Sequence, residues 1–233
     1  MPSATVEDYI KAIYFQQRES AAGEATVVRL SAALGVTKGT VTSMIHKLRD
    51  AELATAERYG GIRLTTKGTR LALDVIRRHR LIEVFLVNVL RFNWSEVHEE
   101  AERLEHAMSR KLLDRLDAFL GHPEMDPHGD PIPDARGRIA APAEMPLRTL
   151  AKGERGVVSR VRDDESAFLE FAARHGLTPG AHVIVVDVVP EAESLRVRPR
   201  AGREVAMSFG AADKILLRRE VPQRRGTSST LPR

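Results

Sequence analysis

One face of a predicted helix carries imidazole and carboxylate side chains at helical spacing. The four residues are His98, Glu102, Glu105 and His106. At about 100° per residue they lie within roughly a quarter-turn of one another, and His79 and Glu83 repeat the i, i+4 spacing upstream. Burying such a set is costly unless a positive charge compensates it, so the pattern predicts a bound divalent cation.

The donor types narrow the choice of cation. The sequence has no cysteine (Cys 0), which excludes thiolate metal sites and disulfides. Nitrogen and oxygen donors favour harder divalent ions, and a carboxylate-rich set suits Mn2+ or Fe2+. The two stripes can face each other in an antiparallel helix pair and hold one or two ions, with Asp8 as a further candidate ligand. The alternative is that these residues form only a solvated helix face.

Two metalloenzyme patterns can be tested against the same residues. A thermolysin-like zinc hydrolase needs His-Glu-x-x-His, but the residue four after His98 is Glu102. A di-iron carboxylate bundle needs Glu-x-x-His on two helices. Ser95 and Arg103 occupy the glutamate positions before His98 and His106. Both patterns fail, and the sequence predicts that the protein is not an enzyme.

The helices that position these residues follow an N-terminal group of shorter elements. Apolar spacing and capping residues predict three helices, followed by two short strands around Tyr59-Gly60-Gly61. The helices are predicted over residues 5–20, 26–34 and 37–51. This is the layout of a winged helix-turn-helix, in which the second helix of the motif enters the major groove of DNA.

The outward face of residues 37–51 suits double-stranded DNA. Short hydroxyls can reach phosphates or base edges, a glycine allows close backbone approach, and basic side chains pair with phosphates. The candidate DNA-binding residues are Thr37, Lys38, Gly39, Thr40, Ser43, Lys47 and Arg49, with Arg58 and Arg63 beside the wing. The formal net charge of +4 permits this function. The alternative is a compact three-helix unit whose polar face is merely solvated.

The rest of the chain changes from helical to β-type periodicity. Long helices are predicted over 66–89 and 95–120, and four prolines between Gly121 and Pro133 exclude regular structure there. The predicted fold class is mainly α with a small β-barrel. The predicted parts are a winged helix-turn-helix at 1–70, a helical domain at 71–125, a linker at 126–144, the β-barrel at 145–220 and a disordered tail at 221–233.

The apolar content excludes two classes of protein. Hydrophobic residues make up 42% of the chain, which is enough to form real cores. No run of about 18 apolar residues occurs, and the N-terminus has no apolar signal core. The sequence therefore predicts a cytoplasmic protein with no membrane partner.

Six segments carry a resemblance to a known family. They are Val6–Tyr14, Leu34–Thr42, Tyr59–Gly68, Arg78–Leu86, His98–His106, and Gly121-His-Pro with Pro127–Pro133. On these segments the chain resembles the diphtheria toxin repressor family of metal-dependent transcriptional regulators, across almost its full length. The resemblance implies a homodimeric, metal-activated repressor with a winged helix-turn-helix, a helical dimerisation domain that holds the metals, and a C-terminal SH3-like domain.

The resemblance also implies two metal sites. The primary ligands would be Asp8, Glu102, Glu105 and His106, and the ancillary ligands His79, Glu83 and His98, with Asp163 as the candidate from the C-terminal domain. Asp8 and Glu102 stand where the iron-responsive branch has sulfur ligands, so the chain is similar to the manganese-responsive branch. Lys11 stands where that branch usually has a further acidic ligand, and a charged lysine cannot ligate a metal.

The placement of Asp8 suggests how a metal would control DNA binding. A metal joining Asp8 to the dimerisation domain would restrict the angle between that domain and the DNA-binding unit. In a dimer this fixes the spacing of two recognition helices, which predicts a palindromic operator. The predicted function is a Mn2+- or Fe2+-dependent repressor of metal-uptake genes. The alternative is a winged-helix regulator that senses a small organic ligand, with the histidine stripe structural.

Overall fold

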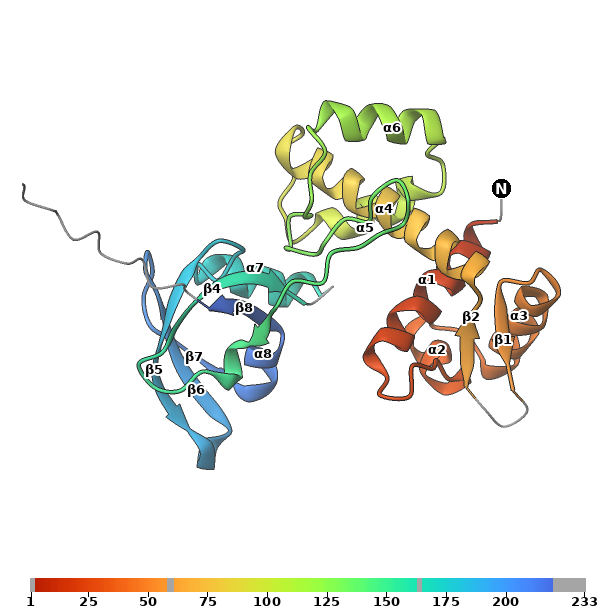
Figure 1. Ribbon diagram of the computed structural model, residues 1–233. Coiled ribbons are helices and arrows are strands. Elements are labelled where there is room, and N and C mark those ends of the chain that lie inside the picture. The colour runs from red at the N-terminus through yellow and green to blue at the C-terminus, as the bar shows by residue number, and fades with distance from the viewer. Residues whose placement is uncertain (1–2, 58–60, 163–164, 220–233) are drawn as a thin grey trace, which may run out of the picture. The chain divides into compact units, whose positions relative to one another are not determined.

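The computed structural model describes residues 3–57, 61–162 and 165–219 of the chain. The chain divides into two compact units, Met1–Ala141 and Pro142–Arg233, and each is described by itself. Figure 1 shows that the first unit is helical apart from one hairpin, while the second is built mainly of strands.

Three short helices and a hairpin form the N-terminal part of the first unit. They are α1 (Ala4–Glu19), α2 (Val27–Ala33), α3 (Lys38–Asp50), β1 (Ala54–Ala56) and β2 (Ile62–Leu64). Each helix begins after a hydroxyl side chain that accepts a backbone N–H, at Ser3, Thr26 and Thr37. Gly35 has a left-handed φ of 63° in the turn between α2 and α3. The predicted order of elements is confirmed, and the hairpin tip at 58–60 lies outside the described residues.

A shared apolar core fixes α1 to the rest of this DNA-binding part. Ile10 and Ile13 of α1 are fully buried, and they belong to one cluster with Leu30 of α2 and Val41 of α3. Burying each such side chain contributes ~1.5–3 kcal/mol. Because α1 is anchored in this core, a force applied to α1 is transmitted to α3.

A long helix connects this part to the rest of the first unit. α4 (Thr66–Asn88) begins against the hairpin, and Figure 1 shows it running from there to α5 and α6. A Cβ on Gly68 would lie 2.0 Å from the Leu53 carbonyl oxygen, so only glycine allows this close approach.

The predicted helix over 95–120 is wrong, because the structure has two helices there. They are α5 (Val97–Glu105) and α6 (Arg110–Phe119). Ser109 lies between them, and its hydroxyl accepts the Leu112 N–H at 3.2 Å. The backbone of Ser109 is extended, so a single helix cannot continue through this residue from α5 into α6.

The start of the predicted linker at 126–144 is ordered and packs against α4. Arg77 donates to the Pro133 carbonyl at 2.8 Å, Arg80 donates to the Pro131 carbonyl at 2.5 Å, and the Ile132 side chain is buried. The boundary between the two units falls between residues 141 and 142. Prolines exclude a ladder of backbone hydrogen bonds, but their carbonyls still accept from arginines that the sequence alone does not place.

The second unit contains a six-stranded antiparallel sheet in the order β3-β8-β4-β5-β6-β7. The strands are β3 (Met145–Pro146), β4 (Arg155–Val161), β5 (His182–Val189), β6 (Ser194–Pro199), β7 (Val205–Ser208) and β8 (Ile215–Arg219). The helices are α7 (Ser166–Arg174) and α8 (Phe209–Asp213), with short 3-10 turns at Leu147–Thr149 and Pro190–Ala192. Within the described residues the sheet does not close, so the predicted β-barrel is not confirmed.

The second unit has fully buried apolar side chains of its own. Leu169 of α7 is fully buried, as are Val185, Leu195 and Ile215 on three strands. Among the described residues no helix combines the length and apolarity needed to cross a bilayer.

Candidate metal centre and DNA-binding face

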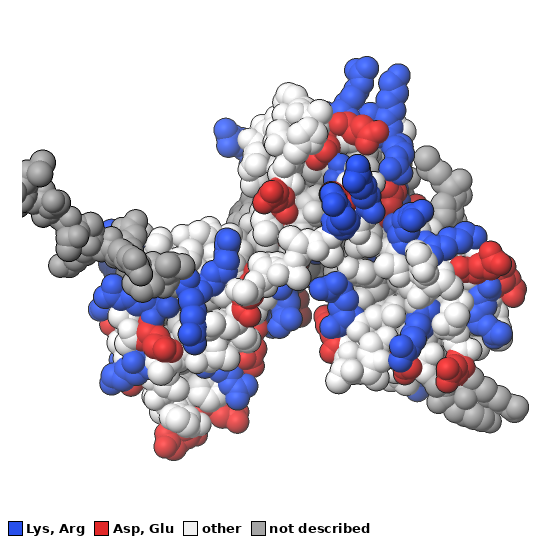
Figure 2. Space-filling view, in the orientation of Figure 1, with Lys and Arg blue, Asp and Glu red and all other residues white. Residues whose placement is uncertain are grey.

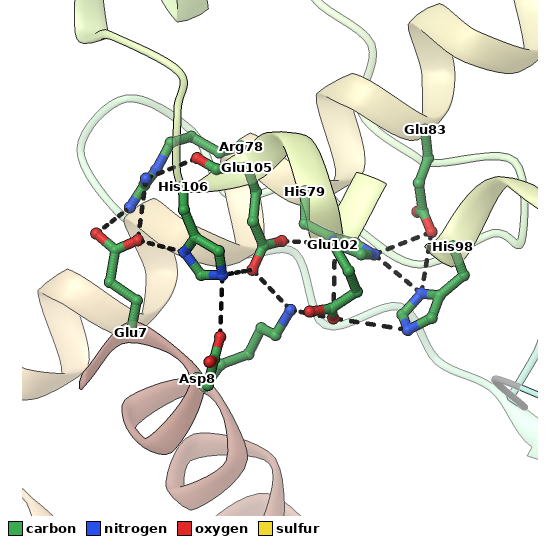
Figure 3. Close-up of polar contacts among 10 residues, drawn as sticks. Glu7, Asp8, Arg78, His79, Glu83, His98, Glu102, Glu105 and His106 are labelled. Atoms are coloured by element: carbon green, nitrogen blue, oxygen red, sulfur yellow. Dashed lines mark hydrogen bonds and ion pairs between the residues drawn. The ribbon is translucent and has the colours of Figure 1, made fainter. Parts of the chain in front are cut away.

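Three helices bring the predicted ligands together in the first unit. Figure 3 shows Glu7 and Asp8 projecting from α1 toward side chains of α4 and α5. α4 contributes Arg78, His79 and Glu83, and α5 contributes His98, Glu102 and Glu105, with His106 as its C-terminal cap. The predicted antiparallel pairing of two histidine-bearing helices is therefore realised by α4 and α5.

The predicted primary ligands form one cluster. Asp8, Glu102, Glu105 and His106 each offer one ligand atom, and these atoms all lie within 4.8 Å of one another. His106 Nε2 lies 3.0 Å from Asp8 Oδ1 and 3.7 Å from Glu105 Oε1. Ligand atoms placed ~2–2.5 Å from one divalent ion are at most ~5 Å apart, so this cluster has the dimensions of a metal site.

Asp8 provides a direct test of whether the residues fit a cation. Its Oδ1 atom is buried, and among the described residues no donor makes a hydrogen bond of acceptable geometry to it. The 3.0 Å approach of His106 Nε2 is an ion-pair distance only. Burial raises the pKa of Asp8, and the nearby Glu102 and Glu105 carboxylates add to this effect. A buried carboxylate oxygen without a donor fits a divalent ion, and the oxygen and nitrogen donors suit manganese or ferrous iron.

Glu7 orients His106, and the sequence did not indicate this role. His106 Nδ1 lies 2.8 Å from Glu7 Oε2, and Arg78 donates to Glu7 Oε1 at 2.8 Å. A carboxylate bonded to one imidazole nitrogen fixes the ring and leaves the other nitrogen for a metal. Here the nitrogen left over is Nε2, which faces Asp8.

Lys11 also belongs to this cluster, although it cannot be a ligand. Its ammonium donates to Glu102 Oε1 and, at 2.9 Å, to Glu105 Oε1. Burial alone would lower the pKa of Lys11, but the Glu105 and Glu102 carboxylates raise it above its ordinary value. The lysine therefore stays charged and has no lone pair to offer a metal.

The predicted ancillary ligands form a second cluster that touches the first. His79 Nε2 lies 3.0 Å from Glu83 Oε1, and His98 Nδ1 lies 3.3 Å from the same oxygen. On its other side, His79 Nδ1 lies 2.6 Å from Glu105 Oε2. Burial disfavours the charged imidazole, but the Glu83 and Glu105 carboxylates outweigh it and raise the pKa of His79 to about 9. His79 thus bridges the two clusters, with one ring nitrogen beside Glu105 and the other beside Glu83.

A third group shares Glu83 and was missed by sequence reasoning. Glu83, Asp126 and His128 are all buried, with one ligand atom each within 4.8 Å. His128 Nδ1 lies 3.8 Å from Glu83 Oε2, and its Nε2 lies 2.7 Å from the Trp94 carbonyl oxygen. Burial raises the pKa of Asp126 to about 7. The signal was present in the segment Pro127–Pro133, which includes a histidine, but that segment was assigned to a linker. Asp163 lies outside the described residues, and its part in an ancillary site stays a prediction.

The predicted DNA-contacting residues are exposed wherever the structure describes them. Those on the exposed surface are Thr37, Lys38, Gly39, Thr40, Ser43, Lys47, Arg49 and Arg63, while Arg58 lies outside the described residues. Arg63 forms a 3.0 Å ion pair with Glu24. On the face shown in Figure 2, basic and acidic side chains are interspersed over the first unit. A DNA interface here therefore depends on the local residues of α3 and the wing more than on a field of one sign.

The fold defines a winged-helix protein whose helical part carries clusters of potential metal ligands, and comparisons with known proteins give its family. Residues 1–62 match the family described as iron dependent repressor, N-terminal DNA binding domain. Residues 65–134 match iron dependent repressor, metal binding and dimerisation domain, and residues 145–219 match the FeoA domain. The second match includes the residues that form all three clusters, except Asp8.

Individual relatives agree with this assignment. The iron-dependent repressor IdeR of Mycobacterium leprae (strain TN) is 30% identical over 194 residues, which are 78% of this chain and 83% of that protein. A solved manganese-dependent transcriptional repressor in complex with manganese has 36% identity and a TM-score of 0.84, covering 91% of this chain and 98% of that one. The IdeR structure from T. acidophilum has 30% identity and a TM-score of 0.75, covering 94% and 100%.

The chain belongs to the iron-dependent repressor family, and it is a metal-responsive, DNA-binding transcriptional regulator. This confirms the resemblance to the diphtheria toxin repressor family found in the sequence. The matched relatives are transcriptional repressors and not enzymes, in agreement with the failed enzyme patterns.

Proposed function

We propose that this chain represses metal-uptake genes by binding a palindromic operator as a homodimer when Mn2+ or Fe2+ occupies its centre. The observation that carries the proposal is the approach of Asp8 on α1 to His106 and Glu105 at the end of α5. This contact joins the DNA-binding part of the unit to its helical part.

The proposed ligands divide into two sets. Asp8, Glu102, Glu105 and His106 would hold the ion at the primary site, and His79, Glu83 and His98 would hold one at an ancillary site, beside Asp126 and His128. Carboxylates at positions 8 and 102 favour manganese, since hard oxygen donors suit that ion. Relatives with similar folds include a manganese regulator, SloR, and the repressor ScaR with bound Cd2+.

The residues around the primary site explain how occupancy would alter DNA binding. A bound divalent ion supplies positive charge that the carboxylates of α1 and α5 share. Asp8 draws α1 toward α5, while Ile10 and Ile13 hold α1 in the core that also contains α3. The position of α3 relative to the helical part is thereby restricted. In a dimer this restriction selects one spacing between two recognition helices, which a palindromic operator with half-sites about one helical turn apart would match.

A homodimer is supported by exposed apolar side chains gathered on the helical part. Six of the exposed large hydrophobic residues lie between the end of α4 and the end of α6: Val89, Leu90, Phe92, Leu104, Leu112 and Phe119. The Phe119 side chain is 68% exposed. Large exposed apolar side chains concentrated in one part of a chain are typical of a protein interface.

The test is a DNA-binding titration with a duplex selected from a random pool. Binding should tighten by at least tenfold with Mn2+ or Fe2+, and Zn2+ serves as the comparison ion. The double variant Glu105→Ala/His106→Ala should lose this response, whereas Glu99→Ala on the exposed face of the same helix should keep it. Specific affinity that is unchanged by a chelator would show that metal control is wrong.

A further inference from the structure

Lys11 places a permanent positive charge inside the proposed primary metal site. It lies one helical turn after Asp8 on α1, so both side chains face α5. Its ammonium contacts one oxygen of Glu102 and, at 2.9 Å, one oxygen of Glu105. The Lys11 side chain is 13% exposed and Glu105 is fully buried, so water screens this interaction poorly.

The carboxylate oxygens are divided among different partners. Glu105 presents Oε1 to Lys11, while His79 takes its Oε2 at 2.6 Å. Glu102 directs Oε1 toward Lys11, and the same oxygen lies 3.9 Å from His79 Nδ1. The ammonium therefore bridges Glu102 and Glu105, and the Glu105 oxygen that it contacts also lies 3.7 Å from His106 Nε2. Figure 3 shows Asp8 and His106 beside these two glutamates.

A charge count shows what this arrangement permits. Asp8, Glu102 and Glu105 together carry three negative charges when ionised, and Lys11 supplies one positive charge. The remaining charge of minus two matches a single divalent ion. A second divalent ion at the same glutamates would lie close to both the first ion and the ammonium, and like charges repel strongly where water is scarce.

We propose that Lys11 acts as a tethered cation that restricts the site formed by Asp8, Glu102, Glu105 and His106 to one divalent ion. This inference rests on the proposed function, because it concerns ions bound at the same residues. Lys11 is thus a specificity-determining residue for ion number and affinity, although it contacts the ion only through the shared glutamates.

Two substitutions at this position separate charge from ligation. Lys11→Glu changes the count from minus two to minus four and adds an oxygen donor, so it should bind one Mn2+ more per chain than the unaltered protein. Lys11→Met removes the positive charge without adding a donor, so it should keep the ion number and bind Mn2+ at least tenfold more tightly. Lys67→Glu is the matched control, because it changes net charge equally at an exposed side chain of α4.

The readouts are the number of bound ions, measured by calorimetry and by elemental analysis after dialysis, and the electron paramagnetic resonance spectrum of bound Mn2+. Two Mn2+ ions that share carboxylates give a broadened, coupled spectrum, and Lys11→Glu alone should show it. If Lys11→Glu binds the same number of ions as the unaltered chain, or if Lys11→Met binds Mn2+ no more tightly, the inference is overturned. Should Lys11→Glu fail to fold, the Lys11→Met affinity still decides.

The same measurements distinguish a wrong role for Lys11 from a wrong proposed function. If the unaltered protein binds no Mn2+ at all, the proposed function is wrong. If it binds Mn2+ and loses an ion in Glu105→Ala/His106→Ala, but the Lys11 variants behave like Lys67→Glu, then only the role of Lys11 is wrong.

Discussion

Replacing Glu7 by alanine should damage both the stability of the first unit and its metal centre. Glu7 is buried and accepts two hydrogen bonds from Arg78, at 2.8 and 3.2 Å. Its Oε2 also lies 2.8 Å from His106 Nδ1. The Glu7→Ala variant leaves a buried guanidinium whose remaining partners are the Glu105 carbonyl at 2.8 Å and the Asp74 carboxylate at 3.7 Å.

The expected loss of stability is large because the remaining charge stays buried. Removing one partner of a buried ion pair typically costs ~3–5 kcal/mol. Arg78 keeps its bond to the Glu105 carbonyl, so we expect the lower end, about 3 kcal/mol. Glu19 provides the control, because it pairs with Arg29 at the same 2.8 Å but at the surface. Glu19→Ala should cost ~0.2–1 kcal/mol.

Urea unfolding of metal-free protein, followed by tryptophan fluorescence, measures this difference in the first unit. The chain has one tryptophan, Trp94, which lies in that unit. Calorimetry on the same variants measures the metal centre: losing the carboxylate that orients His106 should weaken Mn2+ binding ~10–100-fold. The reasoning from burial would be refuted if Glu7→Ala lowered the free energy of unfolding no more than Glu19→Ala does and left the Mn2+ affinity unchanged.

Three further predictions use the same unfolding and binding assays. His79 and His128 have pKa values raised to about 9, from about 6.5 in an unfolded chain, so the folded state holds extra protons between these values. The stability that these two imidazolium groups contribute in the absence of metal should therefore be fully present below about pH 6.5 and be lost by ~1 kcal/mol or more per pH unit toward pH 9; a rise over that range would contradict the assignment. Gly68→Ala should destabilise the first unit by ~1–3 kcal/mol, because the added Cβ would lie 2.0 Å from the Leu53 carbonyl oxygen. Gly39→Ala is the control and should be neutral or stabilising, because the nearest atom to its added Cβ lies 3.8 Å away. Lys47→Ala should lower the slope of log affinity for DNA against log salt by ~0.9, the effect of losing one phosphate contact, and an unchanged slope would remove Lys47 from the interface.

The parts of the fold that the sequence predicts well are those with local causes. The hydroxyl caps at Ser3, Thr26 and Thr37 each bond within their own first turn. The turn at Gly35 needs only a residue that tolerates positive φ. The shared face of the candidate metal ligands on α5 was also predictable, since helical spacing alone places them together. The break before α6 had a local cause too, the cap at Ser109, but the helical pattern on both sides concealed it.

Contacts between residues far apart in sequence account for what was not predicted. Lys11 and Glu102 are separated by 91 residues, and Glu7 and His106 by 99. Arg77, Arg78 and Arg80 in the middle of α4 are buried. Arg78 bonds to Glu7, whereas Arg77 and Arg80 both bond to the proline-rich segment at Pro133 and Pro131. Arg77 and Arg80 thereby order this segment, and that ordering places His128 beside Glu83. Such outcomes depend on which surfaces meet, and periodicity carries no information about that.

The division of contacts on α1 limits how much of the regulation a metal must supply. Glu7 and Lys11 already bond α1 to α4 and α5 without an ion, while Asp8 has a buried oxygen that lacks a donor. A bound metal therefore adds only its interaction with Asp8, because the other contacts of α1 with α4 and α5 form without it. A hundredfold gain in DNA affinity needs about 2.7 kcal/mol of coupling. That is the size of one or two hydrogen bonds to a charged group, so a single carboxylate can provide it. Asp8→Asn should accordingly abolish the metal response while α1 stays docked through Glu7 and Lys11.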